Sequence, residues 1–432
     1  MINKKIKYLF LTIFIIVISL GNLFASNFYY DSLGYIEKNL YNEIKTSLMN
    51  FDVSLGDVGE DFERISDIYY FVLFDNSQLF YVSNKLDYST TTQGDKLISS
   101  KLIFNYKYNN QNNLDYVNNE LFTLKNNFKN QVKGFSDFEI VKYCFEYLIN
   151  NSYYDKNYPD QTLVSVLLDN VGLCSSYAKS FKYLMDYFDI PCLLVEGTFI
   201  NSSENHVWNM VMLDNSWYHV DVTQGDASNS YVDYSYLCVS EYQILKDHII
   251  ESKIPLFSVT SNKYNYLNRV GCFFYYFDKG NIENCIRASI NNESSEIIIG
   301  FDNHINYSKA KTYLIENEGF YEILLKNGYE ISALNYSTND LTDVLIFILD
   351  KDLIKKDIIY FKLYSSDILK KEISRRYKSG KTEFYLLFDN KINLDQAKKY
   401  LIEDQNIFKI IEGNKSLSIK YYDDINRFDI EI

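Results

Sequence analysis

The sequence predicts an α+β protein in which a helix packs on an antiparallel sheet, preceded by an N-terminal helical and mixed region and followed by a duplicated βαββ tail. Three observations lead to this prediction. The 432 residues exceed one hydrophobic core, since a domain takes roughly 150 residues. Helical spacing gives way to a hairpin pattern within residues 111–250. Beyond residue 286, two blocks repeat at a constant offset of 87 residues.

The composition is that of a globular, acidic protein. Hydrophobic residues make up 47% and charged residues 23% of the chain, which excludes a disordered or collagen-like protein. The 57 acidic residues outnumber the 43 basic ones, so the net charge is -14. Nucleic acids and anionic membrane surfaces attract basic proteins, and we therefore expect neither as a main partner.

The first 25 residues have the pattern of a secretory signal peptide. Lysines 4, 5 and 7 precede an apolar run from Leu9 to Leu20, and Ala25 is a small residue suited to cleavage. We therefore expect a secreted, cell-surface or periplasmic protein that is cleaved near Ala25. The alternative is an uncleaved membrane anchor, because the run approaches the ~20 residues of a spanning helix. No later segment is long and apolar enough to span a bilayer.

Residues 26–110 are predicted to form a helical and mixed region. Apolar residues recur at every fourth position from Ile36 to Leu48, which is the spacing of an amphipathic helix. A second helix is predicted over Ile65–Val72.

Two more helices are predicted at the start of the region 111–250. Apolar residues step by three and four from Leu114 to Phe128. Ser136 and Glu139 then form a capping box, in which each side chain satisfies a free backbone amide at a helix start. Cys144 lies on the apolar face of this helix, so we expect a buried structural thiol.

Cys174 begins a further helix. The loop 169–173 leads into it, and an apolar face follows at Tyr177, Phe181, Leu184 and Phe188. The unpaired amides and positive dipole end of a helix N-terminus favour a thiolate over a thiol. A cysteine in this position is nevertheless inert more often than not, so its role depends on the residues that the chain brings next to it.

A β-hairpin is predicted after this helix. Strands over His206–Val211 and Trp217–Val222 flank a two-residue turn, Asp214-Asn215, and this turn makes the residue numbers of cross-strand partners add up to 429. His206 and Asp221 then lie diagonally on one face, about 7–8 Å apart.

These residues are the parts of an activated nucleophile. Cys174 would attack a carbonyl, and His206 would take its proton and return one to the leaving group. Asp221 would fix the imidazole tautomer and stabilise its charged form.

The same residues give the chain a resemblance to the transglutaminase-like superfamily, which shares its core with papain-like enzymes. The matching motifs are Gly172-Leu173-Cys174-Ser175-Ser176-Tyr177-Ala178, His206-Val207-Trp208-Asn209 and Trp217-Tyr218-His219-Val220-Asp221-Val222-Thr223. The likeness covers residues of about 60 to 245 and leaves out the tail. One departure is that Gln224-Gly225-Asp226 comes after the last motif, where the family often has a tryptophan.

The resemblance implies acyl transfer through a thioester on Cys174, with a peptide or carboxamide substrate. We expect hydrolysis, as in a peptidase or amidase, slightly ahead of transamidation, because water is the default acceptor. Among partners, a protein or peptide substrate is expected, including a cell-wall peptide. We expect no cofactor and no metal, since no segment resembles a calcium loop.

Two other interpretations of these residues stay open. A zinc site made of Cys174, His206 and Asp221 is chemically feasible, although the paired spacing of most zinc ligands is missing. The chain could also be a non-catalytic surface protein that keeps the domain as a scaffold for binding or adhesion.

Three neighbouring aromatic residues receive weaker assignments. Trp208 and Trp217 are predicted to be core residues or walls of the substrate pocket. His219 shares a strand face with Asp221, and we expect it to be a packed or solvated strand residue.

The remaining sequence is predicted to form a connecting segment, 251–285, and a tandem repeat, 286–432. Phe301-Asp302-Asn303 and Phe388-Asp389-Asn390 start matching blocks, and the pattern of each block indicates a βαββ unit. His304 corresponds to a lysine in the second block and is given no role. Cys272 and Cys285 are a possible disulfide pair, although sequence alone cannot fix connectivity.

Overall fold

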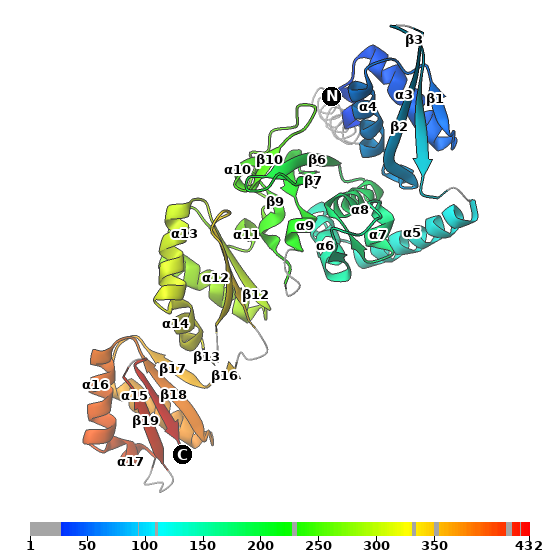
Figure 1. The fold of residues 1–432 in the computed structure, drawn as a ribbon. Helices are drawn as coiled ribbons and strands as arrows, with labels where there is room; N and C mark the ends of the chain where they lie inside the picture. The colour runs from blue at the N-terminus through cyan, green and yellow to red at the C-terminus, as the bar shows by residue number, and fades with distance from the viewer. Residues whose placement is uncertain are drawn as a thin grey trace, which may run out of the picture. The chain divides into compact units, whose positions relative to one another are not determined.

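The computed structural model describes residues 27–93, 95–108, 111–226, 231–330, 334–349, 354–411, 417–423 and 425–432 (Figure 1). The chain divides into two compact units between Val270 and Gly271. The predicted signal peptide, with its cleavage point at Ala25, lies outside the described residues. Within the described ranges, none of the helices has the length and apolar character needed to cross a bilayer.

The first unit begins with helices and a long antiparallel ribbon. The helices are α2 (Phe28–Asp31), α3 (Tyr35–Met49) and α4 (Phe62–Asp75), and the strands are β1 (Ser54–Gly56), β2 (Val82–Gln93) and β3 (Lys96–Tyr106) in the order β1-β3-β2. The short helix η1 (Ser77–Leu79) joins α4 to β2. The predicted helices at 36–48 and 65–72 are therefore present, but the apolar stripe is shorter than predicted. Ile44 and Leu48 are buried, whereas Ile36 is 81% exposed.

Two long helices lead to the central domain. They are α5 (Gln111–Gln131) and α6 (Asp137–Asn151), as the apolar spacing predicts. The capping box at the start of α6 is also present, because the Ser136 amide donates to Glu139 Oε2 at 2.7 Å and the Glu139 amide to Ser136 Oγ at 3.4 Å. Cys144 is fully buried on α6, as predicted.

A turn and a short parallel bridge then set the position of Cys174. The helix α7 (Leu163–Leu167) is followed by β5 (Val171–Gly172), which pairs in parallel with β4 (Tyr153–Tyr154). A Cβ at Gly172 would lie 2.7 Å from Val166 Cγ2 and 2.8 Å from Ser176 Cβ, so only glycine fits this close approach. The helix α8 (Cys174–Tyr187) starts two residues later.

The central sheet has five antiparallel strands. They are β6 (Cys192–Phe199), β7 (Asn205–Leu213), β8 (Ser216–Val220), β9 (Leu237–Val239) and β10 (His248–Ile250), in the order β10-β6-β7-β8-β9. The Asn209 side-chain amide donates to Ala178 O on α8 at 3.0 Å and to Leu193 O on β6 at 3.3 Å. These bonds tie the helix that starts at Cys174 to the sheet.

The predicted hairpin register is confirmed, but its second strand is shorter than predicted. Met210 pairs with His219 and Asn209 with Val220, so partner numbers add up to 429. The predicted pairs beyond Val220 do not form, because Asp221 leaves the strand and caps α9 (Val222–Gly225). Its side chain accepts the Gln224 amide at 3.1 Å, and this bond turns the chain into the helix.

Residues 251–270 belong to the first unit instead of forming a free connection. After the short helices η2 (Tyr234–Tyr236) and α10 (Glu241–Ile244), Ile254 and Val259 are buried in the core, and the chain reaches α11 (Tyr266–Arg269). The remainder of the predicted connection, 271–285, lies in the second unit.

The second unit contains two blocks with the same order of elements. The first consists of β11 (Phe273–Phe274), α12 (Lys279–Asn291), β12 (Glu296–Phe301), α13 (His304–Lys311), the π-helix η3 (Thr312–Glu316), α14 (Gly319–Lys326), β14 (Asn335–Asn339) and β15 (Val344–Ile348). The second consists of β17 (Ile358–Phe361), α15 (Ser366–Lys378), β18 (Glu383–Phe388), α16 (Lys391–Lys398), the π-helix η4 (Lys399–Glu403), α17 (Asn406–Ile410), β19 (Ser418–Tyr422) and β20 (Arg427–Glu431). A separate two-stranded pair is formed by β13 (Tyr329–Glu330), which lies between α14 and β14 in the first block, and β16 (Ile354–Lys355), which lies between the two blocks in sequence.

Each block therefore has one strand and two α-helices more than the predicted βαββ unit, besides a π-helix. Each also has its own four-stranded sheet, β11-β12-β15-β14 and β17-β18-β20-β19. The first strands pair in parallel with the strands that precede the two Phe-Asp-Asn segments. The prediction missed them because they lie upstream of the apolar runs at which the predicted repeat begins. That the blocks arose by duplication stays a prediction.

Cys272 and Cys285, a possible pair on sequence alone, do form a disulfide, which joins the residue before β11 to α12. Cys144, Cys192 and Cys238 are buried free thiols, and burial raises the pKa of each. Cys174 is the remaining free cysteine and is only partly buried. Among the six cysteines, it is therefore the free thiol that a reagent can reach.

The packing of β10 on β6 predicts a sensitive glycine at position 197. A Cβ there would lie 2.0 Å from the Ile249 carbonyl oxygen on β10 and 2.9 Å from Trp208 Cη2. Since a backbone oxygen cannot rotate away, we expect Gly197→Ala to lower the free energy of unfolding by about 1–3 kcal/mol. Urea unfolding followed by circular dichroism measures this change.

Gly56→Ala is the matched control in the same unit. The nearest atom to a Cβ at Gly56 is the Ser100 carbonyl oxygen at 3.9 Å, which is an ordinary contact. We expect this variant to stay within about 0.5 kcal/mol of the wild type. Equal losses in the two variants would contradict the proposed packing of β10.

Candidate active site

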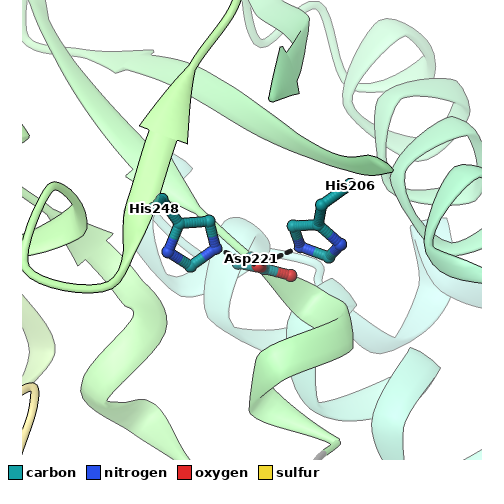
Figure 2. Close-up of side chains that lie close together, drawn as sticks. All are labelled: His206, Asp221 and His248. Atoms are coloured by element: carbon teal, nitrogen blue, oxygen red, sulfur yellow. Dashed lines mark hydrogen bonds and ion pairs between the residues drawn. The ribbon is translucent and has the colours of Figure 1, made fainter. Parts of the chain in front are cut away.

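His206 and Asp221 form a buried hydrogen-bonded pair at one end of the central sheet (Figure 2). His206 comes from the start of β7, and Asp221 is the capping residue between β8 and α9. The Nε2 of His206 lies 2.6 Å from Oδ2 of Asp221, and the two residues are 3% and 0% exposed. The structure thus brings together two of the three residues that the sequence pattern selects, the base and the acid that serve the nucleophile.

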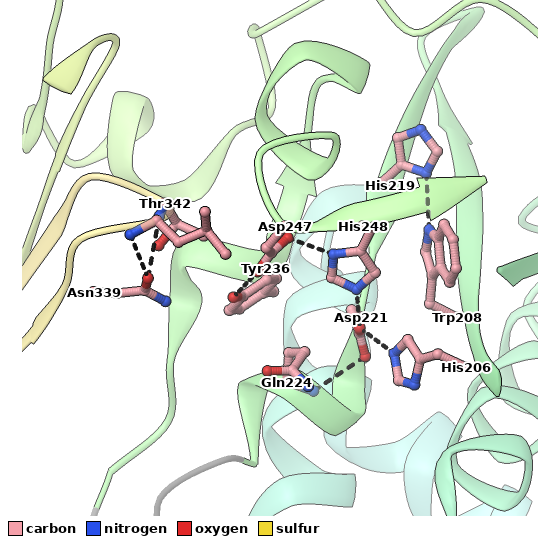
Figure 3. A network of polar contacts seen from close by, with 11 residues as sticks. His206, Trp208, His219, Asp221, Gln224, Tyr236, Asp247, His248, Asn339 and Thr342 are labelled. Carbon is pink, nitrogen blue, oxygen red and sulfur yellow. Dashed lines mark hydrogen bonds and ion pairs between the residues drawn. The ribbon is translucent and has the colours of Figure 1, made fainter. Parts of the chain in front are cut away.

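A second histidine, His248, binds the same carboxylate oxygen. Its Nε2 lies 3.0 Å from Oδ2 of Asp221, and its Nδ1 contacts the Asp247 carboxylate. Asp247 in turn accepts the Tyr236 hydroxyl at 2.5 Å (Figure 3). The sequence-based prediction missed His248, which lies on a three-residue strand outside the three motifs. The one available signal was its rarity, since the chain has only four histidines.

Cys174 lies at the first position of α8, next to His206. Its sulfur is close enough to be among the groups that raise the pKa of the His206 imidazole. Tyr154 is also close, since Cys174 and Asp221 are among the charges that raise its pKa, after burial. Both relations place Cys174 near the pair, and its role as the nucleophile stays a prediction.

The charges of the pair stabilise each other. Burial alone would lower the pKa of His206, but the charge and hydrogen bond of Asp221, with a smaller contribution from Cys174, raise it to about 10. Burial would raise the pKa of Asp221, but His206 and His248 outweigh it and lower the pKa well below its usual value. At neutral pH the geometry therefore favours an imidazolium beside a carboxylate.

The positive charge of His248 is stabilised in the same way. Burial lowers its pKa, and the hydrogen bonds to Asp221 and Asp247 outweigh burial and raise the pKa to about 9. The Asp221 carboxylate is thus placed between two imidazole rings, and its other oxygen is occupied by the Gln224 amide. Each oxygen of this buried charge has a donor.

Trp208 packs directly on this site, whereas Trp217 does not. The Trp208 ring stacks on His206 with centroids 5.8 Å apart and meets His248 edge-on at 4.9 Å. Trp217 instead stacks on Phe257 at 4.8 Å with an interplanar angle of 6°. The predicted pocket-wall role is therefore compatible with the position of Trp208 and is not supported for Trp217.

His219 is a buried strand residue and does not compete for Asp221. The Trp208 indole N–H donates to His219 Nδ1 at 3.1 Å (Figure 3). Burial, and then the nearby charge of His248, lower the pKa of His219 to about 3, so its ring is neutral. This agrees with the packed residue that the sequence pattern predicts.

The departure at residues 224–226 fits the local packing. A Cβ at Gly225 would lie 2.3 Å from Phe145 Cζ, so α9 approaches α6 more closely than any larger residue allows. Asp226 accepts the Tyr177 hydroxyl of α8 at 2.5 Å. These residues join α9 to the helices beside it.

The cluster also contains a possible set of metal ligands. One ligand atom from each of His206, Asp221 and His248 lies within 4.8 Å of the others. Two imidazoles and a carboxylate are a donor set typical of zinc. In the described part of the chain, this set differs from the zinc site considered on sequence alone, because His248 takes the place of Cys174.

Comparisons with known proteins agree with the motifs. The model of the transglutaminase-like superfamily matches residues 126–222, which include Cys174, His206 and Asp221. No curated protein matches the chain.

Similar solved structures include a "TGase", 17% identical over 34% of this chain and 46% of its own, with a TM-score of 0.24. Another is "a Putative Cysteine Protease from Cytophaga hutchinsonii", 12% identical over 36% of this chain and 66% of its own, with a TM-score of 0.23. This chain thus spans less than two thirds of either structure, and the assignment rests on the family model. Residues 126–222 belong to the transglutaminase-like superfamily.

Proposed function

We propose that the protein is a secreted cysteine enzyme that cleaves a peptide or carboxamide bond through a thioester on Cys174. The observation that carries this proposal is the buried His206–Asp221 pair beside the helix N-terminus that presents the thiol. Membership of the superfamily supports it. The disulfide between Cys272 and Cys285 supports an oxidising environment outside the cell.

The first half of the reaction forms the thioester. In the reactive form the Cys174 proton is already on His206, so that a thiolate lies beside an imidazolium. The sulfur attacks the substrate carbonyl carbon, a C–S bond forms, and the carbonyl oxygen becomes an oxyanion. The backbone amide of Cys174 is the proposed donor to this oxyanion. The C–N bond then breaks, and the leaving amine takes the proton from His206.

The second half releases the acyl group. A water gives one proton to His206, its oxygen attacks the thioester carbon, and the C–S bond breaks as sulfur leaves as a thiolate. The products are a carboxylic acid and the original pair of thiolate and imidazolium. An amine in place of water would give a transamidation product through the same steps. We favour hydrolysis, with a protein or peptide substrate such as a cell-wall peptide.

Asp221 and His248 act by positioning in this mechanism. Asp221 holds the imidazole of His206 through Nε2, which leaves Nδ1 for the thiol. His248 does not touch the substrate in the proposed mechanism. It holds Asp221 in place and balances its charge, while Asp247 orients His248.

A zinc-dependent hydrolase is a second candidate, and the cluster of His206, Asp221 and His248 favours it. Bound zinc would polarise a carbonyl or activate a water. A third candidate, the non-catalytic surface protein, would need neither the thiol nor a metal. Alkylation and activity measurements separate the three.

Alkylation tests the nucleophile. At pH 5–6 we expect iodoacetamide to modify Cys174 at least about tenfold faster than Cys144, Cys192 and Cys238, because those thiols are buried. His206→Gln should slow the alkylation of Cys174 itself by about tenfold or more at this pH, since the group that takes up the thiol proton is lost, while the three buried thiols keep their slow rates. Peptide mass mapping of the modified native protein gives the rate at each cysteine.

His304→Gln is the matched control, because His304 is in the second unit and its side chain is 64% exposed. We expect it to react like the wild type. Equal, slow labelling of every cysteine in the wild type would contradict the cysteine enzyme and favour the surface protein.

An activity assay separates hydrolysis, transamidation and zinc chemistry. With unfolded casein and dansylcadaverine, we expect new amino termini to form without incorporation of the amine, and Cys174→Ser to lose at least about 1000-fold in rate. EDTA should leave the rate unchanged, because no proposed step uses a metal.

Loss of activity in EDTA that zinc restores, together with full activity of Cys174→Ser, would instead identify the zinc-dependent hydrolase. Incorporation of dansylcadaverine without cleavage would identify a transamidase. A constant rate in EDTA and no effect of Cys174→Ser would contradict both enzymatic candidates.

The shifted pKa of His248 predicts how stability depends on pH. A free imidazole has a pKa of about 6.5, and the folded value is about 9, so its stabilising effect is complete below pH 6.5 and is lost as pH rises through 9. The contribution is on the order of 3 kcal/mol. We expect His248→Gln to flatten the fall in unfolding free energy between pH 6.5 and 9.

Urea unfolding at a series of pH values measures both slopes. His304→Gln again serves as the control and should keep the slope of the wild type. Parallel curves for the wild type and His248→Gln would show that His248 is not charged in the folded protein.

A further inference from the structure

A hollow of about 700 Å³ lies on the first unit, bordered by β10 and by the chain that follows it. Its wall includes His248, which belongs to the Asp221 network, and His219, which bonds Trp208 (Figure 3). Cys174 is not part of this wall. The hollow is therefore a site separate from the thiol, and a ligand can bind there whether or not the proposed chemistry takes place.

His219, in the wall of this hollow, has a hydrogen-bond donor that no described residue uses. Its Nδ1 accepts the Trp208 indole N–H, so Nδ1 carries no proton and the neutral ring must carry it on Nε2. Nε2 is buried and has no partner within the described residues. Buried donors without an acceptor are rare in folded proteins, and one in the wall of a hollow points to a ligand that supplies the acceptor.

The rest of the wall is mostly apolar, with two serines, Ser252 and Ser258, and one carboxylate. Met210 and Ile254 are buried, whereas Ile200, Leu245, Ile249 and Phe257 are each between 36% and 45% exposed. Apolar side chains that gather around a hollow in this way are typical of a binding site. Glu241 is the acidic residue of the wall, and its helix α10 contacts β8, the strand of His219.

These features select the chemistry of the ligand. A neutral N–H donor suits a carbonyl oxygen, a carboxylate suits an ammonium group, and the apolar wall suits an aliphatic side chain. The first residue of a peptide combines all three when its side chain is apolar. An amino acid amide such as leucinamide is the smallest molecule with the same groups.

We propose that this hollow binds the amino-terminal apolar residue of a peptide, with its carbonyl oxygen on Nε2–H of His219, its ammonium group on Glu241 and its side chain against Met210 and Phe257. Since His248 lines the same hollow, the bound residue contacts the network that holds Asp221. The ligand and the proposed active site thus share one imidazole.

Histidine-labelled protein makes the test direct, because four imidazoles give few signals. Leucinamide is added to ¹⁵N-histidine-labelled Cys174→Ser, which cannot hydrolyse it by the proposed route, and the imidazole resonances are followed. The variants His206→Gln, His248→Gln and His304→Gln assign the signals. We expect the Nε2 resonance of His219 to shift and to saturate, with a smaller shift at His248.

Three analogues test the contacts one by one. Isoamylamine lacks the carbonyl, N-acetyl-leucinamide lacks the ammonium group, and glycinamide lacks the side chain. We expect each to bind about tenfold more weakly than leucinamide or worse. Glu241→Gln should weaken the binding of leucinamide by about tenfold and leave the binding of N-acetyl-leucinamide unchanged. Glu120→Gln, on the distant helix α5, is the control and should bind like the parent.

Several outcomes overturn the proposal. They are an unchanged His219 resonance, equal binding of the four compounds, and equal binding to Glu241→Gln. If sedimentation shows a dimer that Ile249→Asp dissociates, and leucinamide does not shift His219, a second copy covers the hollow and the peptide site is wrong. Alkylation of Cys174 is scored separately, so failure of either proposal leaves the other standing.

Discussion

The buried carboxylate of Asp221 is the interaction on which the first unit depends. The carboxylate is 0% exposed, so protein donors must replace the water molecules that would otherwise bind its oxygens. One oxygen receives the backbone amide of Gln224, and the other receives two imidazole rings. The donors come from β7, α9 and β10, so the end of the sheet is assembled around one side chain.

The surrounding packing keeps these partners in place. Asn209 ties β6 and β7 to α8, which starts at Cys174, and Gly197 lets β10 approach β6 closely enough to deliver His248. Trp208 stacks on His206 and meets His248 edge-on, so that little water reaches the carboxylate. The same indole fixes the tautomer of His219 and leaves a donor facing away from Trp208.

Sequence patterns predicted the features that depend on residues close together in the chain. They did not predict the features that depend on pairing between distant segments. The turn at Asp214-Asn215 was sufficient for the register of β7 and β8, and a capping box was sufficient for the start of α6. The end of β8 was missed because an aspartate can extend a strand or cap a helix, and its surroundings decide. His248 was missed because β10 is three residues long and pairs with a strand far away in the chain.

The two oxygens of the Asp221 carboxylate have different partners: Oδ1 accepts the Gln224 amide, and Oδ2 contacts both imidazole rings. An asparagine at this position would have to keep its carbonyl oxygen towards the Gln224 amide, since two donors cannot face each other. Its NH₂ group would then point at both imidazoles, and each ring would have to accept at Nε2 and carry its proton on Nδ1. His206 would offer the thiol a donor in place of a base. A neutral replacement of nearly the same shape would thus preserve the packing and reverse the path of the proton.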